Sequence, residues 1–249
     1  MGKAGTLVNQ LQEALLYLND PFNWTRRDGI LELLGEHLRI SAVAVLAALV
    51  IAVPVGMVLG HTGHGGGSTV ALSNVSRAIP TLALLTVFAV TPIGFGPRAT
   101  TIALAVFAVP PILTNTYVGF RGVDRDVVEA SRAMGFSEWQ VTMRVELPLA
   151  APLLMTGVRT AAVQVVATTT LAALVAGGGL GSIITLGFRQ LDYGAVLAGA
   201  ILVAALAVLT EALLAALSWA LTPGQRRLPF LQARPATPAA DPAMASSPL

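Results

Sequence analysis

The chain has 249 residues and a formal net charge of +2, and only 11% of it is charged, against about 25% in a typical soluble domain. An apolar content of 55% excludes a disordered protein, and a surplus of two positive charges offers nucleic acid no basic face. Because cysteine is absent, a disulfide framework and a thiolate metal site are also excluded, and the composition predicts a polytopic membrane protein.

The N-terminal segment, residues 1–36, mixes leucines with glutamine and glutamate and predicts an amphipathic, interfacial segment. A turn at Asn19-Asp20-Pro21 divides this segment into two helices. The second helix is expected to begin near Asp28 and to lead directly into the first spanning helix.

Long stretches without charge locate the spanning helices, since a span needs about 20 largely apolar residues at about 1.5 Å each. Barrel strands are shorter and alternate in polarity. The charge gaps predict five spans, at 38–60, 71–91, 98–119, 150–175 and 194–221. The predicted fold class is therefore all-α, a membrane helical bundle over residues 37–221, and the proline-rich residues 222–249 predict a disordered tail.

A polar segment lies between the third and fourth spans, and we call residues 121–148 the elbow. It holds the densest charge cluster of the chain: Arg121, Asp124, Arg125, Asp126, Glu129, Arg132, Glu138, Arg144 and Glu146. Asp124 is expected to cap a first helix that runs to about Met134, and Gly135 to take the left-handed conformation that ends a helix.

A second elbow helix is predicted by Ser137 and Gln140, whose spacing forms a capping box. Pro148 is expected to end this helix. Trp139 and Met143 lie four residues apart on one face, which predicts that they pack down on the bundle. The elbow is thus expected to be a helix–glycine–helix unit held outside the membrane.

The elbow carries a spaced motif made of Glu129, Ala130, Ser131, Gly135, Val145, Leu147 and Pro148. It resembles the EAA motif of ABC importer permeases, with two conservative departures at Ser131 and Val145. The resemblance implies that the elbow docks in a cleft of an ATP-hydrolysing subunit, where small residues permit close approach and Gly135 permits the sharp turn.

Four further stretches, 79–85, 110–117, 157–161 and 176–181, are similar to segments of osmoprotectant permeases. Thr114 departs from that pattern, because many relatives carry arginine there. The resemblance implies a type I ABC importer permease fold and a permease subunit of an ATP-driven, binding-protein-dependent importer of glycine betaine, carnitine, choline or a related compatible solute.

Polar residues inside the spans are candidates for the translocation path: Thr114, Asn115, Thr116, Gln164, Thr168 and Thr169. Threonine in a membrane helix also bonds its own backbone or a neighbouring helix, and this alternative stays open. A glycine-rich loop predicts an outer gate or a partner contact: Gly177, Gly178, Gly179 and Gly181.

The only lysine is Lys3, so a phosphate-cradling Gly-x-x-x-x-Gly-Lys loop is impossible. We therefore expect that the chain is not an enzyme and holds no cofactor. ATP and Mg²⁺ are expected to bind to a partner ATPase. His61 and His64 lie three apart, but no acidic neighbour or third ligand is near in sequence, so no metal site is predicted.

Glu211 and Arg159 are charged residues that fall within predicted spans. Glu211 is expected to have a structural role, with no charged partner apparent in the sequence. Arg159 is expected to reach the cytoplasmic interface or to meet the elbow. A different pattern, Gly56-x-x-x-Gly60, predicts close packing of the first span against another helix.

The resemblance also implies partners: two ATP-binding subunits, a second permease subunit that is identical or paralogous, an extracytoplasmic solute-binding protein and membrane lipid. The expected location is the inner membrane of a bacterial or archaeal cell, with the N-terminus outside and the C-terminus cytoplasmic. Two alternatives stay open. One is an ABC importer permease for an amino-acid-like solute, and the other is a stand-alone secondary transporter, which predicts repeats and paired membrane charges.

Overall fold

The computed structural model describes residues 3–67, 69, 71 and 80–221, and the described elements are helical. The predicted tail at 222–249 lies outside the described residues. In chain order the α-helices are α1 (Lys3–Asn19), α2 (Pro21–Thr25), α3 (Ile30–Thr62), α5 (Thr81–Val90), α6 (Pro97–Arg121), α7 (Arg125–Ala133), α8 (Glu138–Val141), α9 (Leu147–Thr169), α10 (Gly181–Gln190) and α11 (Tyr193–Leu221). A π-helical turn (Thr142–Glu146) precedes α9, and a 3₁₀ turn (Thr170–Val175) follows it.

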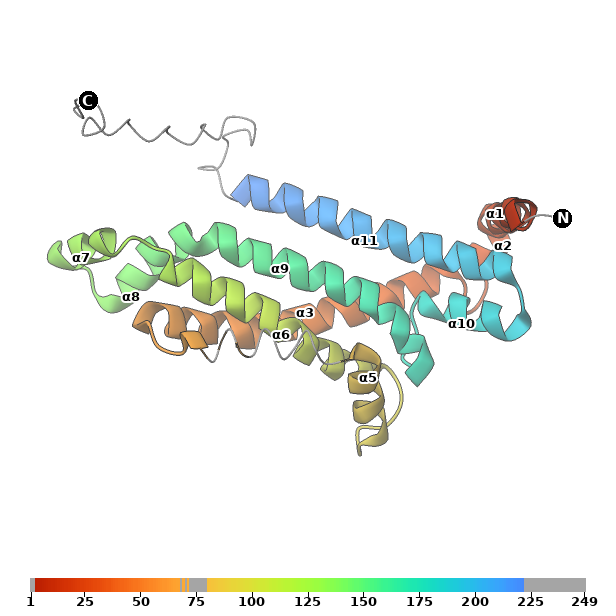
Figure 1. Ribbon diagram of the computed structural model, residues 1–249, viewed down its shortest axis with the longest axis horizontal. Helices are drawn as coiled ribbons and strands as arrows, with labels where there is room; N and C mark the ends of the chain where they lie inside the picture. Colours follow the sequence, from red (N-terminus) through yellow and green to blue (C-terminus); the bar gives the residue numbers. More distant parts are fainter. Residues whose placement is uncertain (1–2, 68, 70, 72–79, 222–249) are drawn as a thin grey trace, which may run out of the picture.

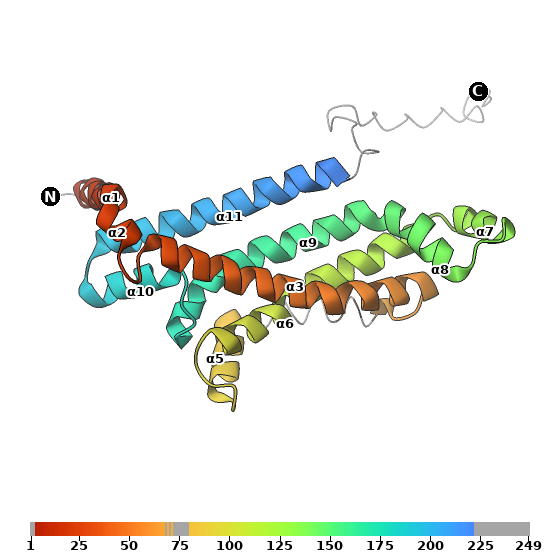
Figure 2. The ribbon, with the colours of Figure 1, turned by 180° about the vertical axis from the view of Figure 1, so that it is seen from behind.

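The long helices α3, α6, α9 and α11 run along the long axis of the molecule (Figure 1). Helices α7 and α8 lie at one end, which we call the elbow end, and α2 and α10 lie at the other, which we call the far end. Helix α6 packs against both α3 and α9, and α11 packs against α9. Figure 2 shows the same arrangement from behind, with α5 projecting away from the bundle near the far end.

Four described helical stretches are long and apolar enough to cross a membrane: Pro21–Thr62, Pro97–Arg121, Glu138–Val175 and Tyr193–Ala220. They match the first, third, fourth and fifth predicted spans. The second predicted span falls partly on residues that the structure does not describe, and its described part holds α5, an apolar helix of ten residues. Helix α3 begins at Ile30 and runs without a break through the first span, as predicted for a helix that starts near Asp28 and leads into that span.

The N-terminal helices cross the far end of the bundle. Helix α1 is seen end-on in both views, so it lies crosswise to the long helices, and it packs on α11 (Figures 1 and 2). The predicted turn is confirmed, since Asp20 accepts a hydrogen bond of 2.9 Å from the amide of Phe22 and caps α2. The indole of Trp24 donates to the carbonyl of Leu18 at 2.7 Å, which ties α2 back onto α1.

The bundle core is built from small residues that let helix backbones approach closely. The predicted packing of Gly56 and Gly60 is confirmed: a Cβ atom at Gly60 would lie 2.5 Å from the Cβ of Phe120 on α6, and one at Gly56 would lie 2.7 Å from Thr116. On α9, a Cβ at Gly157 would lie 2.6 Å from the Cβ of Asn115 on α6. Glycine is thus required where α6 meets its two neighbours.

Replacing Gly60 with alanine is therefore expected to lower the free energy of unfolding by about 1–3 kcal/mol, because the added methyl group overpacks the contact with α6. The measurement is thermal unfolding of the detergent-purified protein. Gly35, in the same helix, is a matched control, since nothing lies within 4 Å of a Cβ there. Equal stability losses for Gly35→Ala and Gly60→Ala would contradict the packing argument.

One predicted helix end is wrong. Pro148 does not stop the second elbow helix, and an unbroken helical stretch runs from Glu138 to Val175. Proline in the first turn of a helix costs no hydrogen bond, and Pro148 stands at that position in α9. The π-helical turn just before it absorbs the change in register, with the amide of Leu147 donating to the carbonyl of Thr142.

Candidate functional site: the elbow and the far-end loop

The elbow turn has the predicted local geometry. Asp124 accepts a hydrogen bond of 3.0 Å from the amide of Asp126 and caps α7. Gly135 has a φ of +87°, in the left-handed region that glycine adopts without strain. Ser137 and Gln140 form both hydrogen bonds of a capping box at the start of α8, at 2.9 and 3.3 Å. Each of these three predictions is confirmed.

The elbow folds around its own small apolar cluster, formed by Val123, Val128 and Val141 with Phe136 beside it. The prediction that Trp139 packs down on the bundle is wrong, because Trp139 is 70% exposed, whereas Val141 is buried in the cluster of the elbow. Met134 is also 70% exposed. The elbow therefore leaves these two large apolar side chains exposed on an otherwise polar segment.

An ion pair between Arg132 and Glu138 joins the two elbow helices across the turn. The guanidinium of Arg132 in α7 donates two hydrogen bonds of 2.9 Å to the carboxylate of Glu138 in α8. This paired geometry fixes the two helices at a defined angle on either side of Gly135. The same hydrogen bonds raise the pKa of Arg132, so the guanidinium keeps its charge.

Helix α3 is joined to the elbow through His61. Its Nδ1 lies 2.5 Å from the carboxylate of Glu146 and 3.3 Å from the hydroxyl of Thr142, and its Nε2 lies 3.2 Å from the carboxylate of Glu138. Glu146 is fully buried. The expectation that His61 has no acidic neighbour is therefore wrong, because the fold brings together residues that are 85 positions apart.

The glycine-rich loop at the far end is held by the start of α3. The amide of Gly179 donates to a carboxylate oxygen of Glu36 at 2.8 Å, and the amide of Leu180 donates to Nδ1 of His37 at 3.3 Å. The opposite ring nitrogen of His37 lies 2.9 Å from the carbonyl of Val166 on α9. His37 is fully buried, so these bonds define its neutral tautomer, with the proton on Nε2.

The predicted path residues differ in burial and in hydrogen bonding. Thr116 and Thr169 are fully buried, and each hydroxyl donates to a backbone carbonyl four residues earlier, at 2.8 Å. Asn115 donates to the carbonyl of Pro111 at 2.8 Å. Thr114 keeps a buried hydroxyl that has no partner among the described residues. Their role in transport stays a prediction.

A polar stripe lies on the exposed face of α9. Gln164 is exposed, and two further exposed residues, Thr156 and Thr160, precede it at four-residue spacing. Thr168 continues the same spacing and is partly buried. Residues four apart share one helix face, so Thr156 and Thr160 extend the predicted pair Gln164 and Thr168 into a line along the helix.

Glu211 has a charged partner that the sequence did not reveal. Its carboxylate on α11 lies 3.1 Å from the guanidinium of Arg159 on α9. This pair satisfies both charges within the long helices, where an unpaired charge is costly. Arg159 therefore contacts α11, and not the elbow.

A family model described as "Binding-protein-dependent transport system inner membrane component" matches residues 48–222. The chain belongs to this permease family. It is 35% identical to the glycine betaine/carnitine/choline transport system permease protein OpuCB of Bacillus subtilis (strain 168), over 76% of this chain and 87% of that protein. It is 37% identical to the choline transport system permease protein OpuBB of the same organism, over 78% and 89%, and 38% identical to the carnitine transport permease protein OpuCB of Listeria monocytogenes, over 76% and 86%.

A solved structure has the same fold. The permease resembles a chain of the MetNI methionine ABC transporter in an inward-facing conformation, with a TM-score of 0.68 and 25% sequence identity over 78% of this chain and 96% of that chain. The predicted all-α, type I importer fold and the resemblance to osmoprotectant permeases are thus confirmed. The protein is a multi-pass inner-membrane permease subunit of the ABC importer type.

Sequence reasoning missed three residues that organise the permease: Glu36, His37 and His61. Glu36 and His37 carried a usable signal, because ionisable residues where an apolar span begins mark structural or functional sites in membrane proteins. His61 carried a weaker one, since its glutamate partners are distant in sequence. Their contacts join α3 to the glycine loop at one end and to the elbow at the other.

Proposed function

We propose that this permease is the membrane subunit of an ATP-driven, binding-protein-dependent importer of compatible solutes such as glycine betaine, carnitine or choline. The observation that carries the proposal is the elbow, which holds the EAA-like motif and exposes two large apolar side chains, Met134 and Trp139. The substrate class rests on the identity of 35–38% to permeases named for these three solutes.

The proposed assembly contains two ATP-binding subunits, a second permease that is identical or paralogous, and an extracytoplasmic solute-binding protein. ATP and Mg²⁺ bind to the partner ATPase, and this chain carries out transport without a cofactor of its own. The elbow then faces the cytoplasm, the N-terminus lies outside and the C-terminus lies inside. The family description names the binding protein and the membrane, which supports this assembly.

Coupling to ATP hydrolysis is proposed to run through Glu129, Ala130, Ser131, Gly135, Val145, Leu147 and Pro148. Glu129 and Ala130 are exposed, whereas Ser131 is buried and donates to the carbonyl of Val127 at 2.7 Å. Because α8 continues without a break into α9, movement of the elbow moves a core helix directly. The His61–Glu146 contact extends the same movement to α3.

The remaining regions have proposed roles in the same scheme. The polar stripe on α9, with Gln164 and Thr168, lines the solute path, while Gly177, Gly178, Gly179 and Gly181 close its outer mouth. Residues 1–36 lie at the membrane–water interface on the extracytoplasmic side of the inner membrane. The crosswise position of α1 and its exposed Val8, Leu11 and Leu15 support that placement.

The proposed function is tested by solute uptake into liposomes that hold the complete importer and its binding protein. Gly135→Val is expected to reduce ATP-driven glycine betaine uptake at least tenfold, on the order of 1.4 kcal/mol of lost coupling, while the spans assemble normally. Gly94→Val is the matched control, because Gly94 has a similar φ of +80°, has open space around it and lies far from the elbow.

Unchanged uptake by the Gly135→Val importer would overturn the coupling role of the elbow. A wild-type importer that transports amino acids but none of the three compatible solutes would instead favour the amino-acid alternative. Uptake that needs no ATPase would favour the stand-alone transporter. These outcomes separate the coupling claim from the substrate claim.

A further inference from the structure

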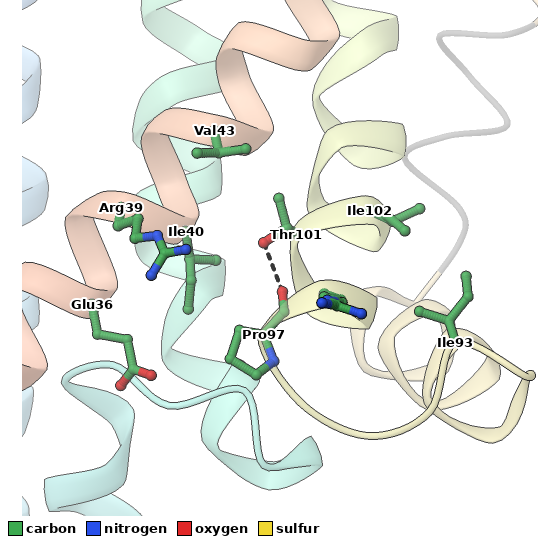
Figure 3. Close-up of a pocket in the computed structure, with 9 residues that line it drawn as sticks. Glu36, Arg39, Ile40, Val43, Ile93, Pro97, Thr101 and Ile102 are labelled. Carbon is green, nitrogen blue, oxygen red and sulfur yellow. Dashed lines mark hydrogen bonds between the residues drawn. The ribbon is translucent and has the colours of Figure 1, made fainter.

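A cavity of about 380 Å³ lies at the far end, between the first turns of α3, the start of α6 and the loop before α6. Figure 3 shows Glu36 and Arg39 of α3 facing the same space as Pro97 and Thr101 of α6. Its volume falls within the range of about 300–1,000 Å³ that is typical of small-molecule sites.

The cavity brings opposite charges around an apolar centre. Arg39 and Arg98 supply two guanidinium groups, and Glu36 supplies a carboxylate. Among the described residues, neither arginine makes an ion pair, and Glu36 uses only one oxygen for the amide of Gly179. The aliphatic side chains of Ile40, Val43 and Ile102 also line the cavity.

We propose that this cavity is an extracytoplasmic binding site in the permease itself for a small zwitterion with a carboxylate and a methylated ammonium group. The arginines Arg39 and Arg98 pair with the carboxylate, Glu36 faces the cationic group, and the aliphatic wall contacts its methyl groups. The proposal rests on the proposed function, because it assigns a site to the solute class named there.

The weak ion pairing that this cavity offers suits a site through which the solute passes and not a site that retains it. Arg39 and Arg98 are exposed, and solvent-exposed ion pairs each contribute little to affinity. A transport pathway needs binding that is favourable enough for entry and weak enough for release. Glu36 also holds the glycine-rich loop through the amide of Gly179, so the same carboxylate contacts both the loop and the solute in the cavity.

The test compares solutes that differ in the carboxylate. Binding of radiolabelled glycine betaine and of radiolabelled choline, which lacks a carboxylate, is measured on the reconstituted importer without its binding protein. The double change Arg39→Gln and Arg98→Gln is expected to raise the Kd for glycine betaine about three- to tenfold relative to that for choline. Arg27→Gln, an exposed arginine outside the cavity, is expected to leave this ratio unchanged.

A second variant keeps the test decisive if the arginine variant fails to fold. Val43 is 48% exposed on α3, so Val43→Trp fills the cavity without disturbing the core and is expected to abolish binding of both solutes. Unchanged binding in Val43→Trp, or an equal loss of both solutes in the arginine variant, would overturn the site. If the wild-type importer takes up glycine betaine with its binding protein but shows no binding without it, the site is wrong and the proposed function stands.

Discussion

Replacing His61 with alanine is expected to lower the free energy of unfolding by about 3 kcal/mol, because Glu146 would remain fully buried without its partner. The same change removes the contact between α3 and the elbow, so ATP-driven uptake is expected to fall further than stability alone explains. Thermal unfolding of the purified permease and uptake by the reconstituted importer measure the two effects separately.

His64→Ala is the matched control for His61→Ala, since His64 is exposed and lies three residues further along the chain. The double change His61→Leu with Glu146→Leu separates packing from coupling. Apolar replacement of both partners of a buried polar contact is often neutral for stability, so this variant should regain its thermal stability while uptake stays low. Full uptake in the double variant would show that the contact plays no part in coupling.

Gly178→Ala is expected to release the far-end loop from α3. Gly178 has a φ of +82°, and a Cβ there would collide with the carboxylate of Glu36. The left-handed backbone alone costs a non-glycine residue about 1–2 kcal/mol, and the collision adds about 1–3 kcal/mol. Lower thermal stability and solute leakage through the reconstituted importer without ATP are the expected results.

Gly94→Ala isolates the backbone contribution in that experiment, because Gly94 has a φ of +80° and no atom within 4 Å of a Cβ. The extra loss in Gly178→Ala then reports the displaced Glu36. If the two variants lose the same stability, the contact between Glu36 and Gly179 contributes nothing to holding the loop.

The helix caps and the turn of the elbow were predictable because the signals for them are local in the sequence. The Asp124 cap, the left-handed Gly135 and the Ser137 capping box each depend on residues within about four positions. The first, third, fourth and fifth spans were predictable for a similar reason, since charge cannot be placed cheaply inside a long apolar helix. Both signals are read from the local sequence alone and need no tertiary contact.

Contacts between distant segments were not predictable from one sequence. His61 meets Glu146 across 85 positions, and Glu36 meets Gly179 across 143. Trp139 was misjudged because a shared helix face does not say whether the bundle or a partner covers it. Pro148 was misjudged because proline both ends helices and opens them, and only the π-helical turn before it decides between the two.

The stretch from Glu138 to Val175 is 38 residues long, or about 57 Å at 1.5 Å per residue, and Gly157, where α9 packs tightly on Asn115 of α6, lies at its midpoint. A rod held at its centre is a lever whose two arms swing in opposite directions. The elbow sits on one arm, and the glycine-rich loop that begins at Gly177 lies just beyond the end of the other. If this stretch turns as one body about Gly157, a displacement of the elbow at one membrane surface moves the other end of the stretch in the opposite sense.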